Sequence, residues 1–261
     1  MKIGAQLYTV HDFTKTLDDL SLSLKKVADI GYKTVQVSGT CPFDPVWMRD
    51  ELQKNGLECV ITHVAPAKIA ENLAQVVRDH AIFGCTHIGI GGMPSDMRGS
   101  LEGYERFVKT WVPIAEQIRD LGAKLHYHNH EWEFVDLEGK HLIDRIFEDF
   151  PEDSIDFTLD LGWAGFAGQD VVALIHKLKG RLSHIHLKDI ADMPADGSIT
   201  TRAYLRPIYE GKLDYDSYIK ALAEVGTEHM LVEQDNSYTE DPFDCLRRSY
   251  ENVTKRFPEV K

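Results

Sequence analysis

Short apolar runs alternate along the whole chain with longer segments in which apolar residues recur at helical spacing. Each short run is bounded by polar or glycine-containing residues, which is typical of a strand. The eight strands that this pattern predicts are Ile3–Val10, Thr34–Ser38, Glu58–Val64, Thr86–Gly91, Lys124–His130, Ile155–Asp160, Leu182–Lys188 and Met230–Glu233.

The segments between these runs read as amphipathic helices, and several of them end at a glycine that leads directly into the next strand. Glycine often stops a helix because it adopts the left-handed conformation without a Cβ clash. The glycines at such positions are Gly31, Gly56, Gly122 and Gly226. Repeated strand, helix, glycine and strand units favour parallel strands joined by crossover helices.

Eight such units favour a closed (β/α)₈ TIM barrel over an open doubly wound sheet. An open sheet normally has a glycine-rich phosphate turn after its first strand, and the turn at Tyr8–Asp12 contains no glycine. No linker or low-complexity tract divides the 261 residues. We therefore expect a single α/β domain over residues 1–261.

Composition narrows the choice of partners. The formal net charge is −13, which disfavours binding to nucleic acid or to an anionic membrane. The N-terminal residues do not resemble a signal peptide, and no apolar run approaches the roughly 18 residues that span a bilayer. The four cysteines form no disulfide-like spacing, so we expect free thiols in a cytoplasmic protein: Cys41, Cys59, Cys85 and Cys245.

The fifth expected strand carries histidines at alternate positions. In a barrel, one side of each strand faces the helices and should be apolar, while the other faces the interior. Leu125 and Tyr127 suit the outer side, which turns His126, His128 and His130 inward.

The same alternation applies to the next strands. Ile185 and Leu187 suit the helix-facing side of the seventh strand, so His184, His186 and Lys188 should point inward. Asp160 ends the sixth strand and Glu233 ends the eighth, and their outward neighbours are Phe157, Leu159, Met230 and Val232.

Four successive strands therefore direct His128, Asp160, His186 and Glu233 toward one region at their carboxyl ends, where barrel enzymes have their active sites. Two carboxylates and one or two imidazoles predict a single divalent metal ion, and the donor set suits Mn²⁺, Co²⁺, Zn²⁺ or Fe²⁺, with Mg²⁺ a further candidate. A lone inward His or Asp is more often a hydrogen-bonded core residue, so the prediction rests on the four together. His126 or His130 could take the place of His128.

Other polar residues are candidates for a substrate pocket: Gln6, Tyr8, Gln36, His63, Glu133, Trp163 and Lys188. Singly, each also fits a structural role. Glu133 is either a substrate-binding acid or a solvated loop residue, and Trp163 either stacks on a sugar or simply packs. Together they predict a wet cavity suited to a polyhydroxylated ligand.

The longest connection runs from about Asp189 to Leu213 and carries Arg202, Arg206 and Tyr209. Long connections at this face of a barrel commonly form part of the site or a lid. A phosphorylated substrate is disfavoured by the acidic charge and by the absence of a phosphate loop, although Arg202 and Arg206 could bind one.

The chain resembles the sugar isomerase/epimerase superfamily, whose members are xylose isomerase-like TIM barrels. The resemblance extends over essentially the whole chain. It rests on segments 4–10, 127–130, 159–164 and 184–189 and on the pair Val232-Glu233, whose order and spacing are typical of the superfamily.

The resemblance implies one divalent metal held by Glu, Asp, His and Glu on four successive strands. Asp160, His186 and Glu233 match the last three ligands, and His128 stands where the first Glu is expected. The His-Asn-His sequence at 128–130 is similar to a branch that includes dehydratase-like proteins. In the epimerases the first and last Glu act as the two acid/base groups, so the substitution leaves His128 or His130 to replace one of them.

The leading functional hypothesis is an isomerase or epimerase of a sugar or polyol ketone. The metal would polarise the carbonyl, Glu233 or a histidine of 128–130 would move the proton, and Lys188 would help to stabilise the enediolate. The alternatives are a lyase resembling inosose dehydratase, an endonuclease IV-like repair enzyme, which the charge of −13 disfavours, and a sugar-binding barrel without catalysis. The expected partner is a small sugar or polyol substrate, with no nucleic acid and no membrane, and a homo-oligomer is compatible with the sequence.

Overall fold

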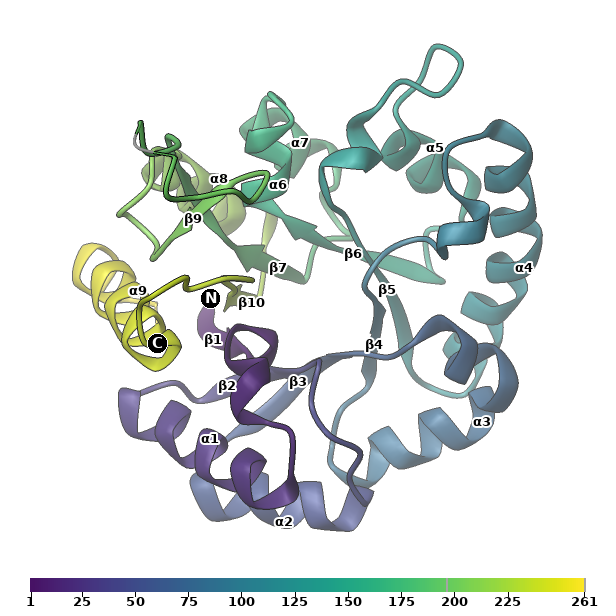
Figure 1. Ribbon diagram of the computed structural model, residues 1–261. Coiled ribbons are helices and arrows are strands. Elements are labelled where there is room, and N and C mark those ends of the chain that lie inside the picture. The colour runs from purple at the N-terminus through teal and green to yellow at the C-terminus, as the bar shows by residue number, and fades with distance from the viewer. Residues whose placement is uncertain (196, 261) are drawn as a thin grey trace.

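The computed structural model describes residues 1–195 and 197–260, and within them eight parallel strands close into a barrel. Their order around the barrel is β1-β10-β7-β6-β5-β4-β3-β2. Figure 1 shows the strands at the centre and the helices around them. The strands are β1 (Lys2–Gln6), β2 (Thr34–Val37), β3 (Glu58–His63), β4 (His87–Ile90), β5 (Lys124–His128), β6 (Ile155–Asp160), β7 (His184–Leu187) and β10 (His229–Val232).

The predicted single-domain TIM barrel is confirmed by this closed sheet. Its first and last strands pair with each other, with Lys2 opposite His229 and Ala5 opposite Val232. The surrounding helices are α1 (Leu17–Ile30), α2 (Pro45–Asn55), α3 (Pro66–Ile82), α4 (Leu101–Asp120), α5 (Leu142–Asp149), α6 (Leu161–Phe166), α7 (Val171–Lys177), α8 (Tyr215–Val225) and α9 (Pro242–Arg256).

The first and fifth strands were predicted to end more than one residue too far along the chain. The first strand stops at Gln6 because the Gln6 side chain accepts a hydrogen bond from the Tyr8 backbone N–H at 3.0 Å and caps the 3₁₀ helix η1 (Leu7–Phe13). The fifth strand stops at His128, and the 3₁₀ helix η3 (Glu131–Phe134) follows His130. Side-chain capping of the next turn therefore ended both strands, which an apolar pattern does not reveal.

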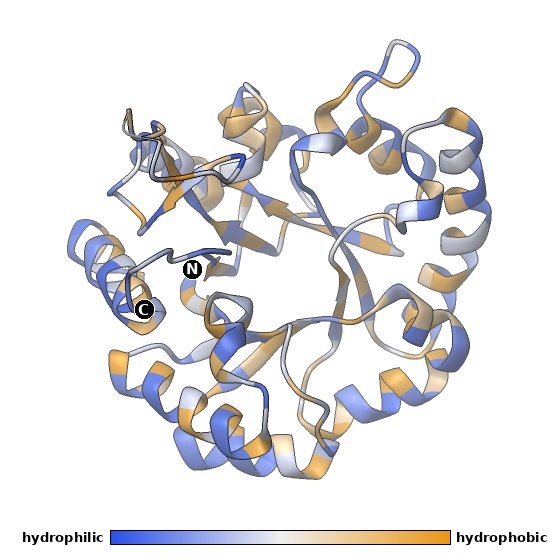
Figure 2. Cartoon of the chain, in the orientation of Figure 1, coloured by the Kyte–Doolittle hydropathy of each residue, from blue (hydrophilic) through white to orange (hydrophobic). Residues whose placement is uncertain are grey.

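The main apolar core lies between the strands and the helices. Tyr127 of β5 is fully buried and its ring lies 5.9 Å from that of Phe107 on α4, so the predicted outward side of this strand is correct. Figure 2 shows helices that carry both hydrophobic and hydrophilic residues, as expected of helices with one buried face. The polar side chains on the other side of each strand therefore point into the barrel.

The long connection from Asp189 to Leu213 contains a two-stranded antiparallel ribbon, β8 (Asp189–Ala191) and β9 (Tyr204–Arg206), which the sequence pattern did not predict. Asp196 of this connection lies outside the described residues. The Asp189 carboxylate accepts backbone N–H groups from Tyr209 and Gly211 at 3.0 Å each. A Cβ at Gly211 would lie 2.2 Å from Asp189 Oδ1, so this turn requires glycine.

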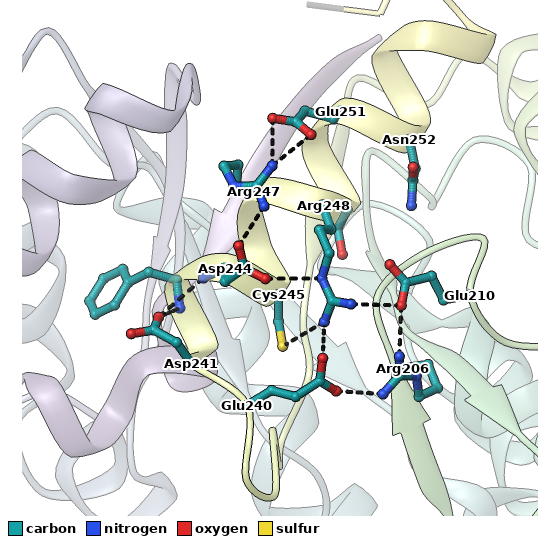
Figure 3. A network of polar contacts seen from close by, with 12 residues as sticks. Arg206, Glu210, Glu240, Asp241, Asp244, Cys245, Arg247, Arg248, Glu251 and Asn252 are labelled. Atoms are coloured by element: carbon teal, nitrogen blue, oxygen red, sulfur yellow. Dashed lines mark hydrogen bonds and ion pairs between the residues drawn. The ribbon is translucent and has the colours of Figure 1, made fainter.

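An ion-pair cluster fastens the same connection to α9 (Figure 3). Arg206 of β9 pairs with Glu240 and with Glu210, the latter at 2.8 Å. Arg248 of α9 pairs with the same two carboxylates, 3.0 Å from Glu210. Such a network holds the ribbon over the barrel mouth more firmly than an isolated surface pair would.

Among the described residues, no helix is both long enough and apolar enough to cross a membrane.

Candidate metal centre

The carboxyl ends of β5, β6, β7 and β10 bring four ligating side chains together. One ligand atom from each of His128, Asp160, His186 and Glu233 lies within 4.8 Å of the others, and all four residues are buried. The structure thus brings together the four residues that the sequence proposed as a metal set. This set of carboxylate and imidazole donors is consistent with a divalent metal site.

Asp160 is held by the start of α6. Its Oδ1 accepts the backbone N–H of Trp163 at 2.8 Å, as an N-cap residue does, and its own N–H donates to Asn129 Oδ1 at 2.9 Å. The second carboxylate oxygen, Oδ2, is buried and faces the interior cluster, 3.0 Å from Lys188 Nζ and 3.8 Å from His186 Nδ1. One oxygen thus fixes the orientation and the other remains for a ligand.

His186 is oriented by Gln36. The Nε2–H of His186 donates to Gln36 Oε1 at 2.6 Å, so Nδ1 is the nitrogen that faces the carboxylates, and a metal ion bound there would replace the Nδ1 proton. Nδ1 lies 2.8 Å from Glu233 Oε2 and 3.8 Å from Asp160 Oδ2. A histidine whose far nitrogen is tied to an amide oxygen in this way is the usual arrangement for a metal ligand.

His128 is oriented in the same manner. Its Nδ1 donates to the backbone carbonyl of Thr158 at 3.2 Å, so Nε2 is the nitrogen available to the cluster. The neighbouring His126, an alternative ligand in the sequence analysis, lies outside this set and contacts His87 instead. His128 is therefore the member of the histidine run that the geometry adds to Asp160, His186 and Glu233.

Three buried atoms converge here: Asp160 Oδ2, His186 Nδ1 and Glu233 Oε2. His186 Nδ1 lies 2.8 Å from Glu233 Oε2, and the Lys188 ammonium lies 3.0 Å from each of the two carboxylate oxygens. Two carboxylates at this spacing repel, and Lys188 is also shared with a third carboxylate, that of Asp235. A divalent cation accepts lone pairs from all three, and so these residues fit the metal that the sequence predicts.

Lys188 supplies positive charge beside the same carboxylates. Its Nζ lies 3.0 Å from Asp160 Oδ2, 3.0 Å from Glu233 Oε2 and 2.9 Å from Asp235 Oδ2. Burial opposes the charged ammonium, but the surrounding carboxylates hold the pKa of Lys188 above its ordinary value. Lys188 therefore neutralises the acids from the side of β7.

The carboxylates also act on His186. Burial alone would lower its pKa, yet Glu233 and Asp160 raise the pKa of His186 to about 9. Conversely, burial would raise the pKa of Glu233, but Lys188 and His186 hold it well below its ordinary range. The cationic groups of Lys188 and His186 thus hold Glu233 as a carboxylate.

A cavity of about 640 Å³ opens above the cluster. His128 and Glu233 lie on its floor, and the ribbon connection contributes Arg202 to its wall. The other lining residues are Tyr8, Ser38, His63, Gly91, His130, Trp163, Thr201, Ala203, Leu205, Asp235, Asn236 and Tyr238. The connection predicted as part of the site does therefore border it.

Neutral histidines flank the cavity. Burial and the neighbouring His186 lower the pKa of His63 to about 3, and burial together with Lys188 lowers that of His130 to about 3. The His63 ring lies 5.1 Å from that of His128, and His130 stacks on Trp132 at 4.0 Å. Both rings present hydrogen-bonding groups to the cavity without adding charge.

Gln6 and Glu133, which were proposed as pocket residues, do not line the cavity, and neither does Arg206, which was considered for binding a phosphate. Gln6 is buried and caps η1, and Glu133 is fully buried, which excludes the solvated-loop interpretation. Glu133 accepts the Tyr127 hydroxyl at 2.7 Å and the His130 N–H at 2.8 Å, and burial raises its pKa to about 7. Arg206 belongs to the ion-pair cluster of Figure 3, away from the cavity.

Trp163 lines the cavity between two cations. Lys188 Nζ lies 5.0 Å and the Arg202 guanidinium 4.2 Å from its ring. The guanidinium also pairs with Glu131 at 2.5 Å. Trp163 therefore packs and borders the cavity at once, so the two interpretations of this residue are not exclusive.

Three contributors escaped the sequence analysis. Asn129, inside the quoted His-Asn-His run, fixes the Asp160 backbone, and Asp235 faces Lys188 from the loop after β10. Asp189 organises the ribbon. An acid two residues beyond Glu233 was the available signal for Asp235, since i and i+2 share a side of an extended chain.

Comparison with known proteins places the chain in a family. Residues 24–249 match the model described as "Xylose isomerase-like TIM barrel". Because this match spans most of the 261 residues, the chain belongs to the xylose isomerase-like TIM barrel family.

Relatives agree with this assignment. Inosose dehydratase of Geobacillus kaustophilus is 26% identical over 192 residues, which cover 64% of this chain and 61% of that protein. A sugar phosphate isomerase/epimerase structure from Parabacteroides distasonis superposes with a TM-score of 0.81 at 18% identity, covering 100% of this chain and 95% of that one. The IOLI protein with a bound zinc atom superposes with a TM-score of 0.74 at 12% identity over 100% and 99% of the two chains. At these identities the structural matches show the shared fold.

Proposed function

We propose that this chain is a divalent-metal-dependent isomerase or epimerase of a sugar or polyol ketone. The observation that carries the proposal is the convergence beneath the cavity of four buried ligand atoms that all lie within 4.8 Å of one another, one each from His128, Asp160, His186 and Glu233. The zinc atom of the IOLI protein and the isomerase/epimerase named for the Parabacteroides structure support the assignment by analogy of fold.

The metal would be held by Asp160, His186 and Glu233, with His128 as the fourth ligand. Mn²⁺, Co²⁺, Zn²⁺ and Mg²⁺ are the candidates. When bound, such an ion polarises a ketone and the adjacent hydroxyl, which acidifies the C–H between them.

Proton transfer then falls to Glu233 and to the histidines of β5. Glu233 reaches the cavity floor from β10, whereas His128 and His130 reach it from β5 and the residues just after it. Two strands, β7 and β6, separate β10 from β5 around the barrel, so the two groups approach a bound ligand from different directions. One would remove the proton and the other would return it at the neighbouring carbon or on the opposite face.

The remaining lining residues would bind and orient a polyhydroxylated ligand. Tyr8, His63 and Trp163 border the cavity, and Lys188 adds positive charge where negative charge develops on the ligand. Glu133 would act indirectly, since it holds the backbone of His130.

Deuterium exchange tests the proposal directly. The metal-loaded protein would be incubated in D₂O with a panel of ketoses, inososes and keto-glycosides, and the products read by NMR and mass. We expect deuterium at the carbon next to the carbonyl with retained molecular composition, and loss of exchange in Glu233→Gln by about 10²–10⁴-fold. Glu58→Gln is the matched control, because Glu58 is an exposed carboxylate at the start of β3, the opposite end of the barrel from the cluster.

A dehydratase is the second candidate. The inosose dehydratase relative favours it, as does a histidine, His128, at the position where the epimerases that this chain resembles have their first Glu. His-Asn-His at 128–130 would then mark the dehydratase-like branch. Loss of one water from an inosose supports this candidate and overturns the isomerase, whereas an isomer that loses no water and gains mass only from deuterium does the reverse.

A sugar-binding barrel without catalysis is separated from both enzymes by the same panel. Ligand binding without exchange or water loss in the metal-loaded protein would overturn both enzymatic proposals.

A further inference from the structure

A second set of histidines lies inside the barrel, apart from the four residues of the metal centre. His87 of β4, His126 of β5 and His184 of β7 each offer one ring nitrogen, and these nitrogens lie within 4.8 Å of one another. His126 is 0% and His184 1% exposed, while His87 is partly exposed. The proposed reaction uses none of these three residues.

The tautomer of His184 leaves a free lone pair. The Ser183 hydroxyl donates to Asp156 Oδ2 at 3.2 Å, so its oxygen accepts the Nδ1–H of His184 at 3.0 Å. Nε2 of His184 is then unprotonated, and it is buried with no hydrogen-bond partner among the described residues. The backbone carbonyl of Val60 can also accept a hydrogen bond from the His184 ring. A ring N–H donated to this carbonyl is therefore the alternative with which a bound ion competes.

His87 and His126 converge on the same space. His87 Nδ1 and His126 Nε2 are hydrogen-bonded to each other at 2.8 Å, so one of the two nitrogens carries a proton that a shared cation would displace. The other nitrogen of His126 lies 3.3 Å from Thr158 Oγ1. Ligand nitrogens about 2.0–2.1 Å from one tetrahedral ion are separated by roughly 3.3 Å. The two nitrogens thus need only a small separation to share a cation, and Thr158 and Ser183 are the outer partners that ligating histidines normally have.

The donor set selects the metal. Three neutral imidazoles and no carboxylate suit zinc and similar transition metals, whereas Mg²⁺ and Ca²⁺ require oxygen ligands. Cations would reach the site at His87, on which the carboxylates of Asp156 and Glu228 act electrostatically.

We infer that His87, His126 and His184 form a second metal site that binds a zinc ion, below the proposed catalytic centre in the barrel. Two strands supply both sites: β5 carries His126 and His128, and β7 carries His184 and His186. At about 3.3 Å per residue, residues i and i+2 are separated by roughly 6.6 Å, so the two ions would lie about that far apart along the barrel.

Zinc stoichiometry tests the inference. Full-length protein would be stripped with a chelator, dialysed against Zn²⁺ and analysed by mass spectrometry of the metal and by titration calorimetry. The variants are His184→Gln and His87→Gln for the lower site and Asp160→Asn for the upper one. His229→Gln is the matched control, because the His229 ring stacks on His184 at 4.8 Å but is not one of the three ligands.

We expect two zinc ions in the wild type and in His229→Gln, and one in each of the other three variants. His87→Gln is included because His87 is partly exposed, so its replacement is the least disruptive to folding, and thermal unfolding by circular dichroism checks each variant. One zinc in the wild type, or two in both His184→Gln and His87→Gln, would overturn the inference. Loss of the upper ion alone in Asp160→Asn separates this result from the test of the proposed function.

Discussion

The two histidine-containing layers of the barrel differ in their charge although β5 and β7 contribute to both. The upper layer combines His128 and His186 with two carboxylates, whereas the lower layer at His126 and His184 contains imidazoles only. Charged acids occur where strand ends meet the N-terminus of α6 and the ammonium of Lys188. The acid of the lower layer, Asp156, is also buried, but it accepts the Ser183 hydroxyl and pairs with Lys124 at 3.5 Å and is not one of the converging ligand groups. Position along the strand therefore sets the donor chemistry.

The largest expected effect tests whether the upper carboxylates are ligands. Asp160→Asn removes a ligand charge while it keeps the N-cap oxygen, so we expect loss of the upper metal and a fall in turnover of at least about 10²-fold. Metal analysis and kinetics on the same samples measure both. Asp18→Asn, an exposed change on α1, is the control. Full metal content and wild-type turnover in Asp160→Asn would remove Asp160 from the site.

Lys188→Met tests the balance of charge in the upper layer. Without the ammonium, Glu233, Asp160 and Asp235 repel one another, and we expect the chelated protein to lose about 3–5 kcal/mol of unfolding free energy. Saturating metal should restore much of this loss, because the ion supplies the missing charge. Urea unfolding with chelator and with Zn²⁺ measures the difference. An equal loss in both conditions would mean that Lys188 acts through packing alone.

Glu133→Gln tests a buried acid that lies behind the cavity and holds the backbone of His130. The folded-state pKa of Glu133 is raised to about 7 from an ordinary value of 4.5. A raised carboxyl pKa favours the folded state at low pH, so this contribution is full below about pH 4.5 and is lost as the pH rises through 7. It amounts to about 3 kcal/mol between these limits.

The glutamine variant should therefore lose less stability than the wild type between pH 5 and pH 7.5. Unfolding free energies at several pH values provide the measurement, and parallel pH curves for the two proteins would contradict the burial of an ionisable Glu133. Most of the turnover should remain, since Glu133 does not line the cavity and acts only through its hydrogen bonds with the Tyr127 hydroxyl and the His130 backbone N–H.

Gln36→Met is expected to have the smallest effect. It removes the acceptor that fixes the tautomer of His186, and loss of such a partner typically weakens metal binding by about 10–100-fold. Gln6→Met is the control. Gln6 lies opposite Gln36 on the neighbouring strand β1, but its side chain caps η1 instead of bonding to His186. Calorimetric metal affinities compare the two. Equal affinities would show that Gln36 does not orient His186.

Most of the barrel was predictable because eight apolar runs that alternate with helical segments are compatible with few other folds. The convergence of His128, Asp160, His186 and Glu233 followed from alternation along each strand and from the shared direction of parallel strands. The ends of β1 and β5 did not follow, because side-chain caps by Gln6 and the turn after His130 determine them.

Two further features depended on contacts across the fold. Asp189 gathers the backbone of residues more than 19 positions away, which no local pattern indicates. The lower layer was visible only in part: alternation turned His126 and His184 inward, but their meeting with His87 depends on the stagger of neighbouring strands.

The most direct measurement is an anomalous-scattering crystal structure of the zinc-loaded protein, recorded on both sides of the zinc absorption edge. The account predicts a peak bounded by His128 Nε2, Asp160 Oδ2, His186 Nδ1 and Glu233 Oε2, at distances of about 2.0–2.2 Å. A zinc-saturated crystal without a peak there, in which Lys188 alone still balances the two carboxylates, would contradict it.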